Sequence, residues 1–266
     1  MQIICFNDKF IRKDELSFYD VERFRVADAC FESILYINGQ IPLLEEHQHR
    51  LDQACKTFQF NSCDIPIAKI LKLLDRNGLA DKTARVRLSI IRSSGNNYRP
   101  EGSETQMLLE CSAVKEIFKP IQKLGVYSNL LKQHNSIASI KHSNALLYVL
   151  ATQFGAANDY DDVLLKNTQG HYIEASSSNF FFIVDHKIYT PNNESGCVLG
   201  VCRNFLVNFL DIKMVEVNDD LLTSADEVFL SNGIQLIQSV KKYGEKELKS
   251  TQTDTIIQHI KAKLAI

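Results

Sequence analysis

Apolar residues recur along this chain with two different periods, and each period predicts one kind of secondary structure. Val86 and Leu88 alternate with polar residues such as Arg87, which is the period of a strand with one buried face. After Leu43 the apolar residues recur three or four positions apart instead, which is the spacing of an amphipathic helix.

The same two patterns predict strands and helices along the whole chain. Strands are predicted at residues 2–6, 33–37, 83–91, 107–114, 125–128, 163–167, 172–174, 179–184, 187–190 and 228–230. Helices are predicted at residues 43–58, 67–77, 144–157, 201–210 and 253–264. Asn7-Asp8 predicts a turn after the first strand, and Asn38-Gly39 is a hairpin signal that closes the strand at residues 33–37. This alternation is typical of an α/β or α+β protein.

The length of 266 residues suits two domains, since domains commonly hold about 150 residues each. Residues 115–123, with Pro120, are the best candidate for a linker. We therefore predict a smaller N-terminal α/β domain over residues 1–118 and a larger C-terminal domain over residues 119–266.

Composition and charge exclude several classes of partner. The formal net charge is −2, and lysine and arginine are scattered, so no basic surface for nucleic acid or an anionic membrane is predicted. No apolar run approaches the roughly 20 residues that span a bilayer, and the N-terminus does not resemble a signal peptide. The seven cysteines include no C-x-x-C pair, which favours reduced thiols. We expect a soluble cytoplasmic protein.

Three separated residues have the chemistry needed to hold pyridoxal 5'-phosphate (PLP). Lys141 precedes a predicted helix, and a lysine amine can form an imine with the PLP aldehyde. Glu174 ends a predicted strand, and a carboxylate can pair with the protonated ring nitrogen. Gly200 opens a predicted helix, whose free N–H groups can bind a phosphate. Each residue alone has a simpler explanation: an exposed loop lysine, a glutamate at a turn, or a plain helix start.

Three arginines are further candidates for ligand contacts. Arg50, on the first predicted helix, could bind a phosphate through its forked guanidinium group, and it could equally lie on the surface. Arg85 and Arg87, on one face of a strand, could bind a substrate carboxylate or simply face solvent. His47 and His49 do not share a helix face, so we predict no metal site.

These residues lie within a longer ordered series of motifs that resembles one known family. The series comprises Asp28-Ala-Cys-Phe-Glu32, Glu46-His-x-x-Arg50-Leu, Arg87 to Gly95, Ile140-Lys-His-x-Asn144, Asn167-x-x-Gly170, Glu174-x-x-x-x-Asn179-Phe, Thr190-Pro191, Leu199-Gly-Val-x-Arg203 and Ala225-Asp-Glu-Val-Phe229. Over most of its length the chain thus resembles the class IV aminotransferases, the fold-type IV PLP enzymes. That family includes branched-chain and D-amino acid aminotransferases and 4-amino-4-deoxychorismate lyases.

The resemblance implies the family's fold, with a mixed, β-barrel-like C-terminal domain that carries helices, and a homodimer. It implies that Lys141 is the Schiff-base lysine and proton carrier and that Glu174 pairs with the pyridine nitrogen. The remaining cofactor-binding positions that it implies are Arg50, Asn179, Gly200, Val201, Cys202, Asn232 and Gly233.

Departures from the family pattern leave the substrate open. The family usually has an aromatic residue and a glycine before Asp28, where this chain has Val26-Ala27, so Val26 is a candidate substrate contact. The Lys141-His-x-Asn144 spacing is more like that of the lyases. Our first hypothesis is an aminotransferase acting on an amino acid and a 2-oxo acid. The alternatives are a 4-amino-4-deoxychorismate lyase and a non-catalytic binding module.

Overall fold

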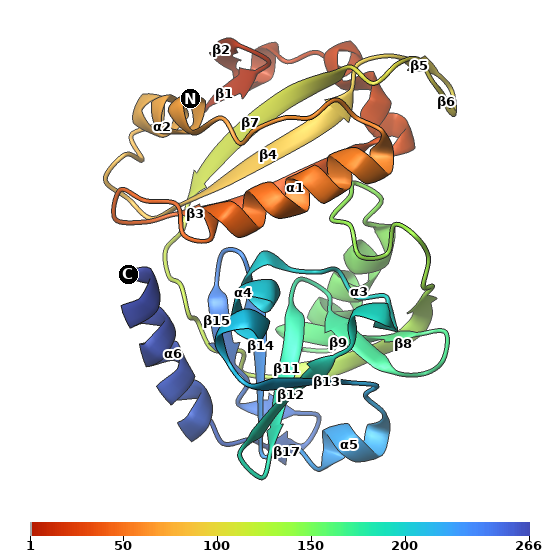
Figure 1. Cartoon of the computed structure of the whole chain (residues 1–266), viewed down its shortest axis with the longest axis vertical. Coiled ribbons are helices and arrows are strands. Elements are labelled where there is room, and N and C mark those ends of the chain that lie inside the picture. Colours follow the sequence, from red (N-terminus) through yellow and green to blue (C-terminus); the bar gives the residue numbers. More distant parts are fainter. Residues whose placement is uncertain (1) are drawn as a thin grey trace. The chain divides into compact units, whose positions relative to one another are not determined.

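The computed structural model describes residues 2–266, apart from the side chains of residues 18–20. It divides into two compact units (Figure 1). The first holds the chain up to Lys115 together with Ile140–Asn144, and the second holds Glu116–Ser139 and Ala145–Ile266. No helix in the described part of the chain is long and apolar enough to cross a membrane.

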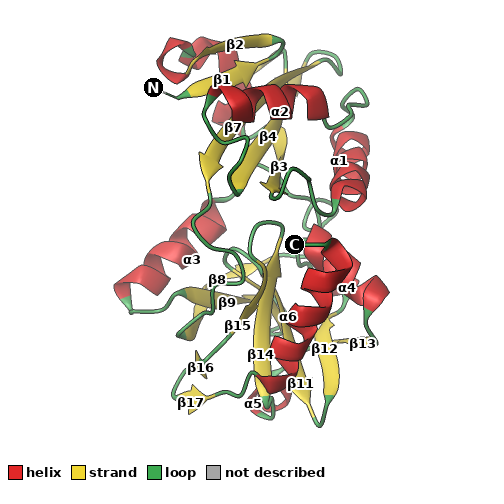
Figure 2. Ribbon diagram, turned by 90° about the vertical axis from the view of Figure 1, so that its left-hand side faces the viewer, coloured by secondary structure: helices red, strands yellow, loops and turns green. Residues whose placement is uncertain are grey.

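The first unit is an antiparallel five-stranded sheet whose order is β2-β1-β7-β4-β3. These strands are β1 (Ile3–Phe6), β2 (Lys9–Arg12), β3 (Ala29–Tyr36), β4 (Ala84–Arg92) and β7 (Thr105–Ala113). Helices α1 (Leu44–Phe58) and α2 (Ile67–Arg76) pack on the sheet (Figure 2). Short elements complete the unit: η1 (Lys13–Glu15), η2 (Phe18–Val26) and the hairpin of β5 (Gly95–Asn96) with β6 (Arg99–Pro100).

The alternation in β4 explains how this sheet holds its helices. Val86 and Leu88 are fully buried in the core shared with α1 and α2. Burial of each such side chain contributes about 1.5–3 kcal/mol. Arg85 and Arg87 lie on the other face and are only half-buried, as the strand period predicts.

The predicted turn at Asn38-Gly39 forms: both residues have positive φ, and Ile37 and Gln40 exchange two backbone hydrogen bonds of 3.0 Å. Ile37 and Gln40 form a single isolated bridge, and no second strand follows them. The chain enters α1 instead, through Leu43 in a left-handed conformation with φ 57°. Strand β3 pairs instead with the distant β4.

The second unit contains two five-stranded sheets. The first has the order β10-β9-β8-β16-β17, built from β8 (Leu124–Lys132), β9 (Asp162–Asn167), β10 (Tyr172–Ala175), β16 (Lys242–Tyr243) and β17 (Lys246–Glu247). The second has the order β13-β12-β11-β14-β15, built from β11 (Asn179–Val184), β12 (Lys187–Pro191), β13 (Ile212–Val215), β14 (Glu227–Asn232) and β15 (Leu236–Ser239).

Isolated bridges join these two sheets at two places, Tyr172 to Val217 and Ile121 to Val240. The sheets therefore enclose a common core, which includes Phe180 and Leu230, and the arrangement is the predicted mixed, barrel-like domain. The helices of the unit are α3 (Leu146–Ala157), α4 (Val201–Phe209), α5 (Asp219–Thr223) and α6 (Thr251–Leu264), with the short turn η3 (Asn193–Ser195).

Strand β9 is buried on both faces, one against the core between the two sheets and the other against helix α3. Leu164 faces the core between the sheets, whereas Val163 and Leu165 face the cluster formed with Ala151 of α3. Because successive side chains point to opposite faces, a strand segment that is buried on both sides is apolar at every position, as Val163–Leu165 is in the middle of β9.

The segment Ile140–Asn144 groups with the first unit because it extends the edge of β3. His142 forms an antiparallel bridge with Cys30. The amide of Phe31 donates to the carbonyl of Lys141 at 3.2 Å, and the amide of Ser143 donates to the carbonyl of Ala29 at 2.9 Å. The sequence places all residues after 118 in the second domain, because it cannot show this long-range backbone pairing.

Candidate functional site

Glu174 lies in β10 with only 3% of its surface exposed, not at a solvent-facing turn. Its Oε1 accepts from Lys132 Nζ at 2.6 Å and from the hydroxyl of Tyr148 at 2.8 Å. Its Oε2 accepts from the amide of Val198 at 2.8 Å. A carboxylate has about four acceptor positions. These contacts fill three of them, so Oε2 can accept one more N–H donor.

Lys132 and Tyr148 are partners of Glu174 that the sequence patterns do not reveal. Burial, followed by the nearby negative charge of Glu174, raises the pKa of Tyr148, so its hydroxyl stays protonated as a donor. Tyr148 follows Asn144 by one helical turn, and this spacing from the lysine motif is a signal that could have found it. Lys132 ends β8 outside every motif, and only the tertiary structure identifies it.

The loop that leads into α4 is fixed to Glu174 by the amide of Val198. The carbonyl of Val198 accepts from Asn179 Nδ2 at 2.7 Å, and the amide of Leu199 donates to the carbonyl of Ser139 at 3.1 Å. Gly200 is the N-cap of α4, and no described side chain caps this helix. A helix start with this geometry favours an anion, through its N–H groups and its dipole.

Gly200 is required by space and not by its backbone angles. Its φ of −67° is open to any residue, but a Cβ at this position would lie 2.1 Å from Asn179 Oδ1. The next two residues of the predicted cradle, Val201 and Cys202, are buried. The thiol of Cys202 donates to the carbonyl of Leu236 at 3.2 Å, which ties α4 to the turn between β14 and β15.

That turn contains Asn232 and Gly233. The side-chain oxygen of Asn232 accepts from the amides of Ile234 and Gln235 at 2.9 and 2.7 Å, and its Nδ2 donates to Ser178 Oγ at 3.0 Å. The Asn232 carboxamide thus holds the turn in shape. The second unit therefore brings Asn179, the start of α4 and this turn into one connected network.

In the first unit, Lys141 lies beside the ring of Phe31. Its Nζ is 4.8 Å from the ring centroid, and the guanidinium carbon of Arg87 is 3.7 Å from the same centroid. Burial, followed by the charge of Arg85, lowers the pKa of Arg87. Arg85 Nη2 donates to Ser33 Oγ at 3.2 Å. The unit thus gathers Lys141 and Arg87 around one aromatic ring, with Arg85 next to them.

Arg50 is buried on α1 and is not the surface arginine that its helix position allowed. Its Nε and Nη2 donate to the two carboxylate oxygens of Glu32 at 2.8 and 2.5 Å, which uses two of its five N–H groups. His47 Nδ1 lies 2.6 Å from Glu32 Oε2. Burial raises the pKa of Glu32, but Arg50 and His47 outweigh it and lower the pKa to about 2.

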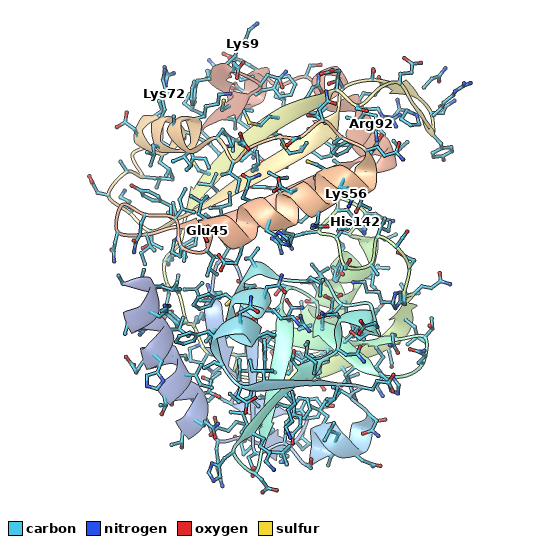
Figure 3. All side chains as sticks on the ribbon, viewed as in Figure 1. Lys9, Glu45, Lys56, Lys72, Arg92 and His142 are labelled. Carbon is cyan, nitrogen blue, oxygen red and sulfur yellow. The ribbon has the colours of Figure 1, made fainter. Side chains whose placement is uncertain are left out.

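Val26 ends η2 and is half-buried. The next residue, Ala27, has φ 55°, the left-handed conformation that favours glycine. Asp28 Oδ2 then accepts from Arg23 Nη2 at 2.7 Å and from Arg92 Nε at 2.8 Å; Arg92 is labelled in Figure 3. This loop therefore keeps a backbone suited to glycine although alanine occupies the position.

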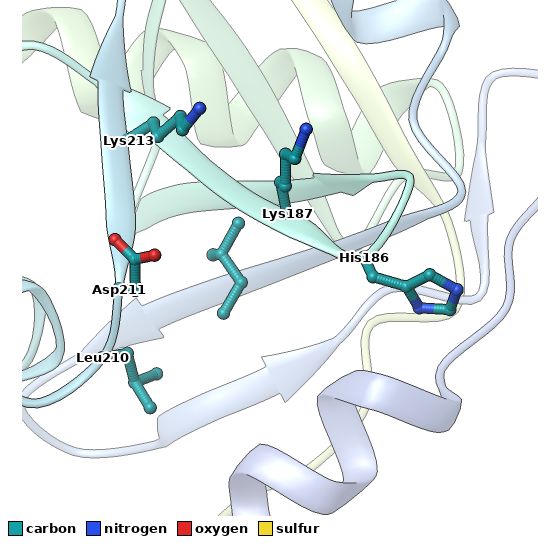
Figure 4. A pocket seen from close by; sticks show the side chains of 6 residues that line it. His186, Lys187, Leu210, Asp211 and Lys213 are labelled. Atoms are coloured by element: carbon teal, nitrogen blue, oxygen red, sulfur yellow. The ribbon is translucent and has the colours of Figure 1, made fainter.

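The predicted residues fall into two sets, one in each unit. Lys141, Arg50, Arg85, Arg87 and Val26 belong to the first unit, and the other predicted residues belong to the second. Figure 4 shows a pocket of the second unit near the β11–β12 turn. Its lining residues are His186, Lys187, Ile188, Leu210, Asp211 and Lys213, none of them a predicted site residue.

Comparison with known proteins identifies similar chains. The model of the family described as "Amino-transferase class IV" matches residues 29–243. The aminodeoxychorismate lyase of Vibrio harveyi is 28% identical over 244 residues, which cover 85% of this chain and 87% of the relative.

Two solved structures share the fold. The branched-chain amino acid aminotransferase of Escherichia coli has a TM-score of 0.86 at 19% identity, over 99% of this chain and 94% of that one. A hypothetical aminotransferase from Mycobacterium tuberculosis, solved in its PLP-bound form, has a TM-score of 0.83 at 17% identity, over 98% of each chain.

Proposed function

Because the chain belongs to the class IV aminotransferase family, and so is an enzyme, we propose that it uses PLP to transfer an amino group from an amino acid to a 2-oxo acid. The observation that carries the proposal is buried Glu174, which has one acceptor position left and a hydrogen bond to the loop that leads into α4. The PLP-bound relative with the same fold supports the choice of cofactor.

The described residues fit PLP at two points. Glu174 Oε2 can accept one further N–H donor, as the nitrogen of a protonated ring requires. At the start of α4, backbone N–H groups have no described capping side chain, and Gly200 is packed closely against Asn179. When bound, PLP supplies an electron-accepting ring that stabilises negative charge at the substrate α-carbon.

The roles of the protein residues follow from their chemistry. Lys141 bonds the cofactor aldehyde through its amine and carries the proton to and from the substrate α-carbon. Glu174 keeps the proton on the ring nitrogen. The N–H groups of Val201 and Cys202, at the start of α4, hold the phosphate.

Three further residues complete the proposed phosphate site. The Asn232-Gly233 turn contributes backbone donors, because the Asn232 carboxamide is already used within the turn. Arg50 contributes N–H groups that its pairing with Glu32 leaves available.

Arg85 and Arg87 are proposed to bind the substrate carboxylate. A guanidinium group offers two parallel N–H donors to a carboxylate, and Arg87 contacts the same Phe31 ring as Lys141 does. We propose that Val26, at the end of η2, shapes the substrate pocket in place of the aromatic residue that the family usually has there.

A second candidate activity is a lyase that releases pyruvate and 4-aminobenzoate from 4-amino-4-deoxychorismate. Two observations favour it: the Lys141-His142-x-Asn144 spacing and the 28% identity to the lyase of Vibrio harveyi. His142, labelled in Figure 3, packs its ring edge-on to Phe58 at 6.4 Å between centroids. The lyase would use the same cofactor residues.

We also propose that the enzyme acts in the cytoplasm as a homodimer. All seven cysteines carry free thiols, which suits a reducing compartment. Large apolar side chains are exposed on β8 and α3, namely Leu130, Leu131, Leu146 and Val149. A second copy of the chain would cover such surface, and light scattering of the purified protein measures the mass that decides this.

The decisive experiment assays both reactions on one purified sample. Conversion of bound PLP to its pyridoxamine form by amino acids alone identifies an aminotransferase. Pyruvate release from 4-amino-4-deoxychorismate without an amino acceptor identifies the lyase. A Lys141→Ala variant should lose turnover, while Lys56→Ala, on the exposed side of α1, should keep it. Full turnover in Lys141→Ala, or failure of the wild type to take up PLP, would refute the proposal.

A further inference from the structure

Lys132 is a buried cation at the end of β8 that neither the sequence motifs nor the proposed roles use. Its side chain is 10% exposed. Its ammonium donates to Glu174 Oε1 at 2.6 Å, to the hydroxyl oxygen of Tyr148 at 2.8 Å and to the carbonyl of Ala138 at 3.0 Å. An ammonium group has three donors, so each of them has an acceptor.

We propose that Lys132 is a positioning residue that orients the Glu174 carboxylate toward the cofactor's ring nitrogen. This inference rests on the role proposed for Glu174. Lys132 and Tyr148 together occupy Oε1, so an incoming ring N–H can bind only at Oε2. The Val198 amide holds Oε2 from a second direction, which fixes the rotation of the carboxylate.

The charge of Lys132 matters as well as its hydrogen bonds. A carboxylate that is 3% exposed loses much of its hydration, and it stays ionised at low cost only beside an opposite charge. Tyr148 supplies a donor without charge, and Val198 supplies a backbone dipole. Lys132 supplies the positive charge that is hydrogen-bonded to Glu174, and buried Arg203 adds a second positive charge that interacts with Glu174 without a hydrogen bond.

The same ammonium connects Glu174 to the segment that precedes Lys141 in the chain. Ala138, which accepts from Lys132, is followed by Ser139, whose carbonyl accepts from the amide of Leu199. Leu199 immediately precedes Gly200, the N-cap of α4. Removal of the ammonium should therefore loosen the carboxylate together with the loop proposed to hold the phosphate.

Lys166 provides a matched control in the same unit. It donates to the two carboxylate oxygens of Asp219 at 2.9 and 3.1 Å, and its Nζ lies 4.3 Å from the centroid of the Tyr172 ring. It thus has the same kinds of partner as Lys132, a carboxylate and a tyrosine. Asp219, however, is largely exposed and belongs to none of the proposed cofactor contacts.

The experiment compares Lys132→Met, Lys132→Arg and Lys166→Met with the wild type. PLP is removed from each protein, and the dissociation constant for added PLP, the thermal midpoint of the apo form and the pH dependence of the visible spectrum after reconstitution are measured. We expect PLP binding by Lys132→Met to be roughly tenfold weaker, the effect of losing one hydrogen bond to a charged group. We expect its spectrum to titrate at a different pH from that of the wild type.

Lys132→Arg should recover most of the affinity, and Lys166→Met should stay within about twofold of the wild type. Unchanged or tighter PLP binding by Lys132→Met, with only a lower thermal midpoint, would overturn the proposal. Lys132 would then stabilise the fold without orienting Glu174 toward the cofactor. If Lys132→Met does not fold, Lys132→Gln, which keeps N–H donors without the charge, takes its place with the same expectation. A wild type that does not bind PLP refutes the proposed function instead.

Discussion

Replacement of Gly200 by alanine adds one methyl group at the start of α4, where the structure leaves no room for it. The new Cβ would lie 2.1 Å from Asn179 Oδ1 and 3.3 Å from Asn179 Cγ. The backbone of Gly200 has φ −67° and ψ 142°, which alanine adopts without strain. The whole cost should therefore come from the collision.

The magnitude follows from what must move. Asn179 is buried, and its Nδ2 donates to the carbonyl of Val198 at 2.7 Å. Overpacking of a buried site costs about 1–3 kcal/mol, and loss of this hydrogen bond adds about 1 kcal/mol. We expect Gly200→Ala to lower the free energy of unfolding by about 2–4 kcal/mol and to weaken PLP binding, since α4 must shift.

The assay is a double-mutant cycle by urea unfolding of the apo protein. Asn179→Ala removes the atoms that the methyl group meets, so Gly200→Ala should cost little in that background. The expected coupling between the two sites is therefore about 2–4 kcal/mol, nearly the whole cost of Gly200→Ala. Gly155→Ala in α3 is the control, because its added Cβ has no neighbour closer than 3.4 Å and alanine favours a helix by about 1 kcal/mol.

Equal costs of Gly200→Ala in the wild-type protein and in the Asn179→Ala variant would refute the reasoning. The methyl group would then act on something other than the Asn179 side chain. Normal PLP affinity in a destabilised Gly200→Ala protein would separate the collision from the proposed phosphate contact.

Three further predictions concern the first unit. Burial raises the pKa of Glu32, but Arg50 and His47 outweigh burial and lower it to about 2. The ionised carboxylate should therefore stabilise the fold by on the order of 3 kcal/mol above pH 4.5, and this stabilisation should be lost as the pH falls toward 2. Glu32→Gln should remove that pH dependence from unfolding curves and cost about 3–5 kcal/mol at neutral pH. Ala27→Gly relieves a left-handed alanine and should raise stability by about 0.5–1 kcal/mol, so a lower melting temperature would contradict it. Arg87→Ala and Arg85→Ala should each raise the KM for the amino acid by roughly 10- to 100-fold at unchanged PLP affinity. An unchanged KM in both variants would contradict the proposed carboxylate site.

Much of the fold follows from residue periods that are local in the sequence. Strand β4 and helix α1 lie where alternating and helical spacings predict them, because burial of one face decides both. The turn expected at Asn38-Gly39 forms, but it closes a single bridge, because turn residues specify a reversal of the chain and not a strand that pairs after it.

The candidate site shows the same division. Lys141, Glu174 and Gly200 are predicted from motif spacing, which a linear sequence displays. The partners Lys132 and Tyr148 were not found, because a hydrogen bond across 42 positions from Lys132 to Glu174 has no local pattern. Glu32 lay within a quoted motif, but its pairing with Arg50 links two different elements.

The sequence by itself determined the family, most of the longer strands and helices, and the residue types available for PLP chemistry, because periodicity and motif spacing are properties of the chain alone. It did not reveal β2, β13, β15 or α5. Only the tertiary structure decided which of those groups are buried and what each one contacts. Burial and ion pairing set the energetic cost of each charged group and the direction in which its pKa shifts. For Glu174 both arise when β8, β10 and α3 pack together. The buried pair of Lys132 and Glu174 exists only at that level.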